Sequence, residues 1–333
     1  MVHFKSLTLA ANMTTQAQLM GSEQDFLNRV EDVNFRPIFI TGPHRSGTTL
    51  LYRVLAASGS FNVTSVFHIL NRQRLLQLHF TGQEQQARVE LDRLFESRGV
   101  KGTELNMGAI DPDFLEEYCY AFDYPGRRPV LDEKNLPGFQ LFCKKVQVVQ
   151  DPARDLLLKN PFDAANFLRI REMFPQARFV FIYRHPAAVI DSQIRLLRYT
   201  FAERREYFAI LMPRYNDLYN SPFKLALARF FYSGRFPFLL QQVSRNLSRA
   251  CDYILENVDK LGSVAIGVTY PELCRDTNQV VRRVHEFLGV QEKTPQDYSK
   301  LIRTREPVLL PEVQDHLPWI EKRNAAYLKR FGL

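Results

Sequence analysis

The feature that most constrains this chain is residues 38–51, where an apolar run leads through a glycine-containing loop into a helical pattern. The apolar residues beyond Gly47 recur at helical spacing, namely Leu50, Leu51, Val54 and Leu55. A strand that enters a helix in this way directs loop amides and the positive end of the helix dipole at one point. Gly42 and Gly47 permit backbone angles and close approaches that a Cβ forbids. The loop is therefore predicted to bind a phosphate-like anion.

This loop departs from the pattern of nucleoside-triphosphate-binding loops at one position. Those loops read G-x-x-x-x-G-K-[ST], and their Lys contacts the β- and γ-phosphates. Here the spacing from Gly42 to Gly47 fits, but Thr48 occupies the Lys position and the strong cation of the loop is Arg45. The pattern disfavours a P-loop kinase-like phosphotransferase. That function stays as an alternative, together with a non-catalytic nucleotide-binding protein.

Composition and charge fit one large domain that binds an anion. The 333 residues can bury a large core, and a net charge of +8 suits a polyanionic nucleotide. The basic residues are dispersed, so nucleic acid is not expected as a partner. The histidines are scattered and no two cysteines form a C-x-x-C pair, so neither a metal site nor a disulfide framework is predicted; the cysteines are Cys119, Cys143, Cys251 and Cys274.

The ends of the chain carry few signals. Residues 1–34 read as a polar tail with a short helix near 23–31, and residues 35–333 read as a single domain. Residues 1–21 lack the apolar core of a signal peptide, and no stretch approaches the roughly 18 apolar residues of a membrane span. We therefore expect a cytoplasmic protein without a transmembrane segment. No pattern in the sequence specifies its oligomeric state.

A second informative region lies between residues 155 and 198. It alternates apolar and helical patterns, in the order strand 156–159, helix 162–174, strand 178–183 and helix 186–198. This alternation predicts an α/β fold with a central parallel sheet flanked by helices. Ligands of such sheets bind beyond the carboxyl ends of the strands. Because Arg45, Lys159 and Arg184 all follow strand ends, we expect them to converge on one ligand.

Two motifs resemble those of sulfotransferases that use 3′-phosphoadenosine 5′-phosphosulfate (PAPS). Residues 43–51 resemble the 5′-phosphosulfate loop of the carbohydrate and tyrosylprotein branches and their bacterial relatives. Residues 174–192 resemble the 3′-phosphate motif, in which an Arg at a strand end and a Ser eight residues later hold the phosphate. Arg184 and Ser192 have that spacing. An Arg binds phosphate through two N–H groups, and a Ser two helical turns along faces the same ion.

The resemblance implies a P-loop-like fold of the kind shared by sulfotransferases and nucleotide kinases. It implies transfer of a sulfuryl group from PAPS to an acceptor hydroxyl without a metal, giving a sulfate ester and 3′,5′-diphosphoadenosine. Segment 158–162 resembles the tyrosylprotein stretch whose Lys assists transfer, which implies catalytic roles for Lys159 and Arg45. The residues implied in cofactor binding are Arg45, Ser46, Gly47, Thr48, Thr49, Arg184 and Ser192.

The residue that removes the acceptor proton is less well defined. In the family this base tends to follow the second strand, which makes His68 the first candidate, with Glu104 and His79 as alternatives. The tyrosylprotein branch has a Glu near the position of Ser65, so a peptide tyrosine is disfavoured as acceptor.

The acceptor is predicted to be a hydroxyl-bearing small molecule, lipid or carbohydrate. Segments 70–150 and 200–260 carry no family motif and are expected to form the acceptor pocket and its lid. Within the first of them, residues 111–120 are predicted to be helical. Aromatic side chains in both segments suit a hydrophobic acceptor or core packing alike, and they include Phe114, Tyr118, Tyr120, Phe122, Phe208 and Tyr215.

Overall fold

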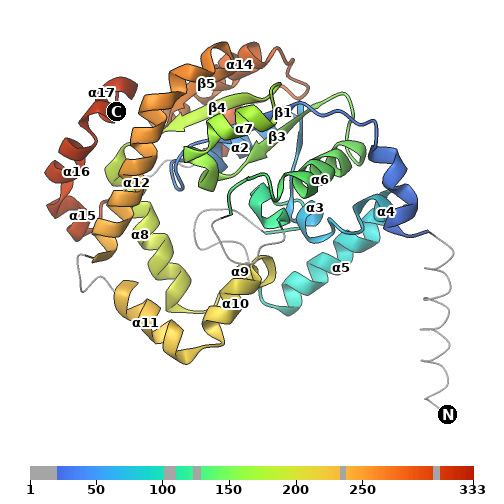
Figure 1. Ribbon diagram of the computed structural model, residues 1–333, viewed down its shortest axis with the longest axis horizontal. Coiled ribbons are helices and arrows are strands. Elements are labelled where there is room, and N and C mark those ends of the chain that lie inside the picture. The colour runs from blue at the N-terminus through green and yellow to red at the C-terminus, as the bar shows by residue number, and fades with distance from the viewer. Residues whose placement is uncertain (1–20, 101–109, 123–128, 233–237, 303–307) are drawn as a thin grey trace.

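The computed structural model describes residues 21–100, 110–122, 129–232, 238–302 and 308–333. At its centre lies a parallel sheet of five strands in the order β2-β3-β1-β4-β5 (Figure 1). The strands are β1 (Pro37–Thr41), β2 (Phe61–Val63), β3 (Asp155–Lys159), β4 (Arg178–Tyr183) and β5 (Ala265–Thr269). The predicted α/β fold with a central parallel sheet is confirmed.

Helices cover both faces of this sheet. The first half of the chain contributes η1 (Glu23–Val30), α2 (Thr48–Ala56), α3 (Val66–Leu70), α4 (Leu75–Phe80), α5 (Glu84–Ser97), η2 (Tyr118–Ala121), α6 (Leu136–Val148), η3 (Pro161–Ala165) and α7 (Phe167–Met173). The second half contributes α8 (Pro186–Ala202), α9 (Glu206–Leu211), α10 (Pro213–Tyr219), α11 (Pro222–Tyr232), α12 (Phe238–Asn257), η4 (Val258–Val264), α13 (Tyr270–Arg275), α14 (Thr277–Leu288), η5 (Tyr298–Leu301), α15 (Pro311–Asp315), α16 (Leu317–Arg323) and α17 (Ala325–Phe331).

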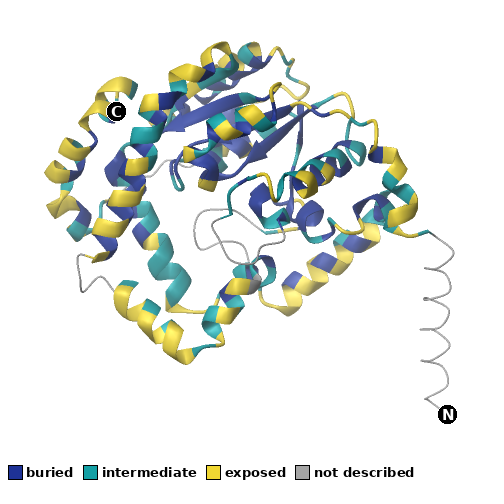
Figure 2. Cartoon of the chain, viewed as in Figure 1, coloured by how far each residue is buried: buried dark blue, intermediate teal, exposed yellow. Residues whose placement is uncertain are grey.

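Successive side chains of a strand point to opposite faces of the sheet, and each face packs into its own hydrophobic core. On β1, Ile38 and Ile40 pack with α2 and α14, whereas Phe39 points to the other face and packs with α6 and α7. All five residues of β1 and of β3 are buried (Figure 2). Strands covered on both faces carry continuous apolar runs, which is why they were readable from the sequence.

The predicted helix over residues 111–120 is wrong. Leu115 forms an antiparallel bridge with Ser65, and only Tyr118–Ala121 form a short 3₁₀ turn, η2. The backbone amides of residues 66 and 67 donate to the carbonyls of Phe114 (2.9 Å) and Pro112 (2.8 Å). Backbone hydrogen bonds to the residues that follow β2 thus hold this segment in an extended conformation. Local helix propensity does not predict such long-range pairing.

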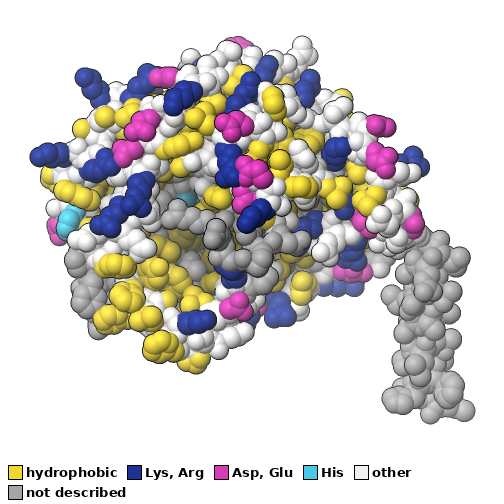
Figure 3. Space-filling model, viewed as in Figure 1, with side chains coloured by type: hydrophobic (Ala, Val, Ile, Leu, Met, Phe, Trp, Pro, Cys, Tyr) yellow, Lys and Arg dark blue, Asp and Glu magenta, His cyan; other side chains and the backbone are white. Residues whose placement is uncertain are grey.

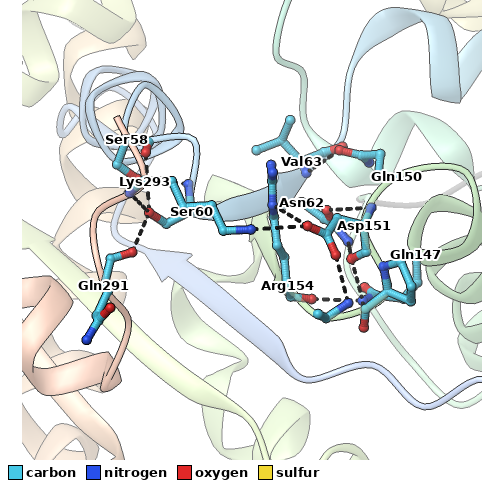
Figure 4. Close-up of polar contacts among 12 residues, drawn as sticks. Ser58, Ser60, Asn62, Val63, Gln147, Gln150, Asp151, Arg154, Gln291 and Lys293 are labelled. Carbon is cyan, nitrogen blue, oxygen red and sulfur yellow. Dashed lines mark hydrogen bonds and ion pairs between the residues drawn. The ribbon is translucent and has the colours of Figure 1, made fainter. Parts of the chain in front are cut away.

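Side chains from other parts of the fold cover the free edge of β2, which is an outer strand of the sheet. Gln150 covers its backbone, because its amide accepts from Val63 N (3.2 Å) and donates to Val63 O (2.9 Å). Asn62 donates to the carbonyl of Asp151 (2.7 Å), and Lys293 pairs with the Asp151 carboxylate (3.2 Å; Figure 4). These contacts satisfy an edge that would otherwise offer free hydrogen-bonding groups to another strand.

The short helix expected near residues 23–31 is present as η1. Glu23 joins it to the rest of the molecule, since its carboxylate pairs with Lys145 (2.5 Å) and accepts from Gln77 N (2.9 Å). Residues 1–20 and Glu104, an alternative base, lie outside the described residues. The domain boundary between residues 34 and 35 stays a prediction.

Candidate functional site

The loop between β1 and α2 has the backbone of an anion-binding turn. Arg45 and Gly47 both adopt left-handed conformations, with φ of +71° and +107°. A Cβ at Gly42 would lie 2.7 Å from both the carbonyl oxygen of Ile182 and Ser46 Oγ, and one at Gly47 would lie 2.5 Å from the ring of Tyr270. Both glycines are therefore required by space, and Gly47 also by conformation.

Arg45, Arg184 and Ser192 come together beside this loop. Arg45 Nε donates to Ser192 Oγ (3.0 Å), and Arg184 Nη1 donates to the carbonyl of Arg45 (3.0 Å). The Arg184 guanidinium also lies 4.1 Å from the centre of the Tyr270 ring, a cation–π contact. The structure thus joins the predicted 5′ and 3′ motifs, which are about 140 residues apart in sequence.

These two arginines form a site of uncompensated positive charge. Among the described residues, neither guanidinium forms an ion pair with a carboxylate. Burial, followed by the repulsion of Arg184, lowers the pKa of Arg45. By contrast, the nearby Arg195 and Arg198 are paired with Asp191 (2.8 Å) and Glu312 (2.5 Å). Glu117 is near enough to attract Arg45 electrostatically, but no described carboxylate contacts either guanidinium. Two adjacent cations without such a contact are the arrangement that a bound dianion would complete.

Polar groups of the loop are also left for a ligand. Ser46 is fully buried, yet its Oγ has no hydrogen-bond partner in the described structure. The N-cap of α2 is Gly47, so no side chain caps the first amides of this helix. Within the described residues, a hydroxyl without a partner, helix amides without a side-chain cap and two guanidinium groups without a carboxylate together fit a phosphate or sulfate group.

Lys159 approaches the same helix from the end of β3. Its Nζ donates to Thr49 Oγ1 (3.0 Å) and pairs with Glu117 Oε1 (2.9 Å). The Lys159 side chain is only 2 % exposed, so the ion pair lies in a weakly screened environment. β3 and β1 are paired with Ile40 opposite Lys159, and this register brings the lysine to the loop.

A second carboxyl lies next to this ion pair. Glu116 is buried and accepts from Tyr207 OH (2.5 Å) and from the amide of Glu117 (2.9 Å). Burial raises the pKa of the Glu116 carboxyl to about 7, and the attraction of Lys159 opposes that rise. The extended chain at 111–117 thus delivers two adjacent carboxyls to the site from a segment without a family motif.

The predicted base His68 lies at the start of α3. Its Nδ1 accepts from the amide of Ser65 (3.1 Å) and contacts Ser65 Oγ (2.9 Å), an arrangement that caps the helix. Burial, with a smaller effect of Arg88, lowers its pKa to about 3. With Nδ1 used as an acceptor, the other ring nitrogen of the neutral side chain carries the proton. These contacts weaken the assignment of His68 as base, which stays a prediction.

His79 and the aromatic residues considered for an acceptor pocket make different contacts from those of the loop residues. His79, on α4, hydrogen-bonds to Glu84 (2.9 Å) and packs against Phe80, and the residues it contacts belong to α4 and α5. The aromatic residues considered for an acceptor pocket pack mainly in the core. Tyr118, for example, donates to Asp163 (2.6 Å) and packs against Phe39 and Phe139.

The comparisons with known proteins agree with this site. The sequence profile of the Sulfotransferase family matches residues 37–294, which includes the loop, Lys159, Arg184 and Ser192. This chain belongs to the sulfotransferase family. No curated protein matches it by sequence. Family and fold together support a sulfotransferase activity, and therefore a transferase.

Among the solved structures that match, two bacterial sulfotransferases share the fold at low sequence identity. Sulfotransferase STF9 from Mycobacterium avium is 14 % identical, with a TM-score of 0.62 over 92 % of this chain and 79 % of that one. Sulfotransferase STF1 from Mycobacterium tuberculosis H37Rv is 16 % identical, with a TM-score of 0.53 over 90 % of this chain and 79 % of that one. At such identity the likeness concerns the fold alone.

The described residues contain no cluster of three or more His, Cys, Asp or Glu side chains arranged to hold a metal ion. None of their helices combines the length and the apolar character needed to cross a bilayer.

Sequence reasoning missed three residues of this sulfotransferase site. The sequence predicts a helix at Glu117, and only the neighbouring Glu116 distinguishes this position in the sequence. Gln193, directly after Ser192, donates to the carbonyl of His44 (2.7 Å) and holds the loop against α8. Tyr270, at the start of α13, contacts both Gly47 and Arg184 and marks where β5 joins the site.

Proposed function

We propose that this sulfotransferase uses PAPS as its donor and transfers the sulfuryl group to a hydroxyl of a small molecule, lipid or carbohydrate. The observation that carries the proposal is the pair of guanidinium groups of Arg45 and Arg184, which have no carboxylate partner among the described residues. The buried Ser46 hydroxyl of the same loop has no hydrogen-bond partner in that part of the chain either. A mononucleotide with phosphate groups at both its 3′ and 5′ positions matches two such anion sites better than a linear triphosphate does.

Each anionic end of the donor has its own set of residues. The 5′-phosphosulfate is assigned to the loop amides and to Arg45, Ser46, Gly47, Thr48 and Thr49, and the 3′-phosphate to Arg184 and Ser192. PAPS supplies an activated sulfuryl group when bound. Arg45 already contacts Ser192 (3.0 Å), so one hydrogen-bonded group serves both ends and fixes their separation.

Lys159 and Arg45 are proposed to stabilise negative charge that develops during transfer. Lys159 is held by Thr49 and Glu117 in a buried position, so its ammonium group is already oriented and little solvent must reorganise. Loss of one such charged donor typically costs a factor of about 10²–10³ in kcat.

The acceptor proton has two candidate destinations. His68 stays the prediction from the sequence, but its Nδ1 is engaged with Ser65. We propose Glu117 as the second candidate, because its carboxylate already touches Lys159, which touches Thr49 of the loop. The two are separable by activity: His68→Asn should retain turnover if Glu117 is the base, and Glu117→Gln should abolish it.

A labelled-donor assay tests the proposed activity. The protein is incubated with a panel of hydroxyl compounds and either PAPS labelled in its sulfur or ATP labelled in its γ-phosphate with magnesium. We expect label to pass from PAPS to an acceptor and none from ATP, with Lys159→Met reducing kcat by about 100-fold. Transfer from ATP would instead support the kinase-like alternative. Lys159→Met turnover equal to wild type would refute the catalytic role of Lys159. The cytoplasmic location and the absence of a metal requirement stay predictions.

A further inference from the structure

Helix α11 presents an apolar stripe to the outside of the molecule. Phe223, Leu227, Phe230 and Phe231 lie at positions i, i+4, i+7 and i+8, which share one face of a helix. Their exposed fractions are 77 %, 46 %, 51 % and 38 %, and no residue of this helix is buried. Phe231 also packs against Phe238 (5.6 Å between ring centres), itself 50 % exposed, which extends the stripe to the start of α12. We call these five side chains the α11 stripe.

The opposite side of α11 is anchored. Tyr232 stacks on Phe201 of α8, with 4.5 Å between ring centres. Arg229 donates to the carbonyls of Phe201 and Ala202 (2.9 Å each), the last residues of α8. A cation at the end of a helix is favourable because it meets the negative end of the dipole. These contacts fix the orientation of α11, so the stripe is held outward. Figure 3 shows the resulting gathering of hydrophobic side chains over α11, at the lower left.

The charge of this part of the chain has one sign. Between Asp217 and Asp252 no acidic residue occurs, and the interval contains five basic ones: Lys224, Arg229, Arg235, Arg245 and Arg249. Lys224 is exposed on α11, and Arg245 and Arg249 are exposed on α12; Arg235 lies outside the described residues. This acid-free interval contains the exposed aromatic helix α11.

We propose that the α11 stripe docks on the surface of a bilayer that contains anionic lipids. An amphipathic helix lies in the membrane interface when aromatic and leucine side chains form one face and basic residues flank it. Each basic side chain near an anionic surface strengthens attachment about fivefold. A symmetric dimer through this face would bring two acid-free, basic segments together, which like-charge repulsion opposes. The proposal is independent of the donor and of the reaction.

Vesicle sedimentation tests this docking. Wild-type protein is mixed with phosphatidylcholine vesicles that contain phosphatidylglycerol, with pure phosphatidylcholine vesicles, and with no lipid. We expect binding to the anionic vesicles that is at least about tenfold stronger than to the neutral ones and that weakens as salt is raised. The double variant Phe223→Ser with Phe230→Ser should lose at least about tenfold in partitioning, and Lys224→Glu should lose several-fold.

A matched control separates the stripe from general surface hydrophobicity. Leu94 and Val308 are 39 % and 85 % exposed and lie outside the stripe, so Leu94→Ser with Val308→Ser should bind as wild type does. Circular dichroism and a thermal melt check that all variants are folded. Equal binding by the stripe variant and wild type, or no preference for anionic vesicles, would overturn the proposal. A wild-type dimer in analytical ultracentrifugation that the stripe variant converts to monomer would also overturn it, since the stripe would then join two copies.

Discussion

At the scale of single residues, the site depends on how its charges are paired. Arg45 and Arg184 have no carboxylate partner in the described structure, whereas Lys159 is neutralised by Glu117 at 2.9 Å. The first arrangement leaves attraction available for an incoming anion. The second holds a cation and a carboxylate in place until a substrate competes for them. In the proposed function Arg45 serves both anion binding and charge stabilisation, whereas Lys159 and Glu117 serve the transfer step.

The Lys159–Glu117 pair predicts a stability signature. Lys159→Met should lower the free energy of unfolding by about 3–5 kcal/mol, because it leaves the buried Glu117 carboxylate unpaired. The double variant Lys159→Met with Glu117→Gln should recover most of this loss, since neither charge remains. Denaturant unfolding of wild type, both single variants and the double variant gives the coupling. Additive effects of the two substitutions would show that the pair does not interact as described.

His68 predicts a pH signature of stability. Its pKa is lowered from 6.5 to about 3 in the folded protein, so the unfolded chain binds more protons between those values. Stability contributed by neutral His68 is therefore present above pH 6.5 and lost as the pH falls. His68→Asn should reduce the drop in unfolding free energy between pH 7 and pH 4.5 by about 2 kcal/mol. An unchanged drop in the variant would mean that folding does not lower the pKa of His68.

At the scale of elements, the glycine loop and the extended segment 111–117 form the site, and they differ in how readable they are. The loop has a local cause: two glycines at a fixed spacing between an apolar strand and a helix. The position of Glu117 has a non-local cause, since its segment pairs with residues 64–67. Sequence patterns therefore identified Arg45, Arg184 and Ser192 as neighbours through their motifs, and could not identify Glu117.

Substitution of Gly47 tests whether the loop between β1 and α2 can accommodate an added methyl group. Gly47→Ala combines a φ of +107° with a Cβ that would lie 2.5 Å from Tyr270. Gly82→Ala serves as the matched control, because Gly82 has a φ of +69° but open space around its Cβ position. Both variants should lose about 1 kcal/mol to backbone strain, and Gly47→Ala should lose about 1–3 kcal/mol more through the clash. Thermal melts measure the difference, and equal losses would mean that the loop yields to the added methyl group.

At the scale of the whole molecule, the sheet determines which parts of the chain meet. Parallel pairing places the ends of β1, β3 and β4 at one edge, and so assembles Arg45, Lys159 and Arg184. The continuous apolar runs of the strands and their alternation with helices predicted this edge. The order of the strands and the packing of α9–α12 depend on long-range contacts, and these leave no periodic pattern in the sequence. The position of the acceptor pocket, which stays a prediction, would depend on the same long-range contacts.

The central claim is that Arg184 and the glycine loop form a site for a 3′,5′-bisphosphorylated nucleotide. Isothermal titration calorimetry with 3′,5′-diphosphoadenosine, 5′-AMP and ATP with magnesium tests it on wild type, Arg184→Ala and Ser192→Ala. We predict that the diphosphate binds wild type at least about 100-fold more tightly than 5′-AMP, and that Arg184→Ala removes most of this preference while 5′-AMP binding changes little. Equal affinity for the diphosphate and 5′-AMP, or tighter binding of ATP with magnesium, would contradict the account.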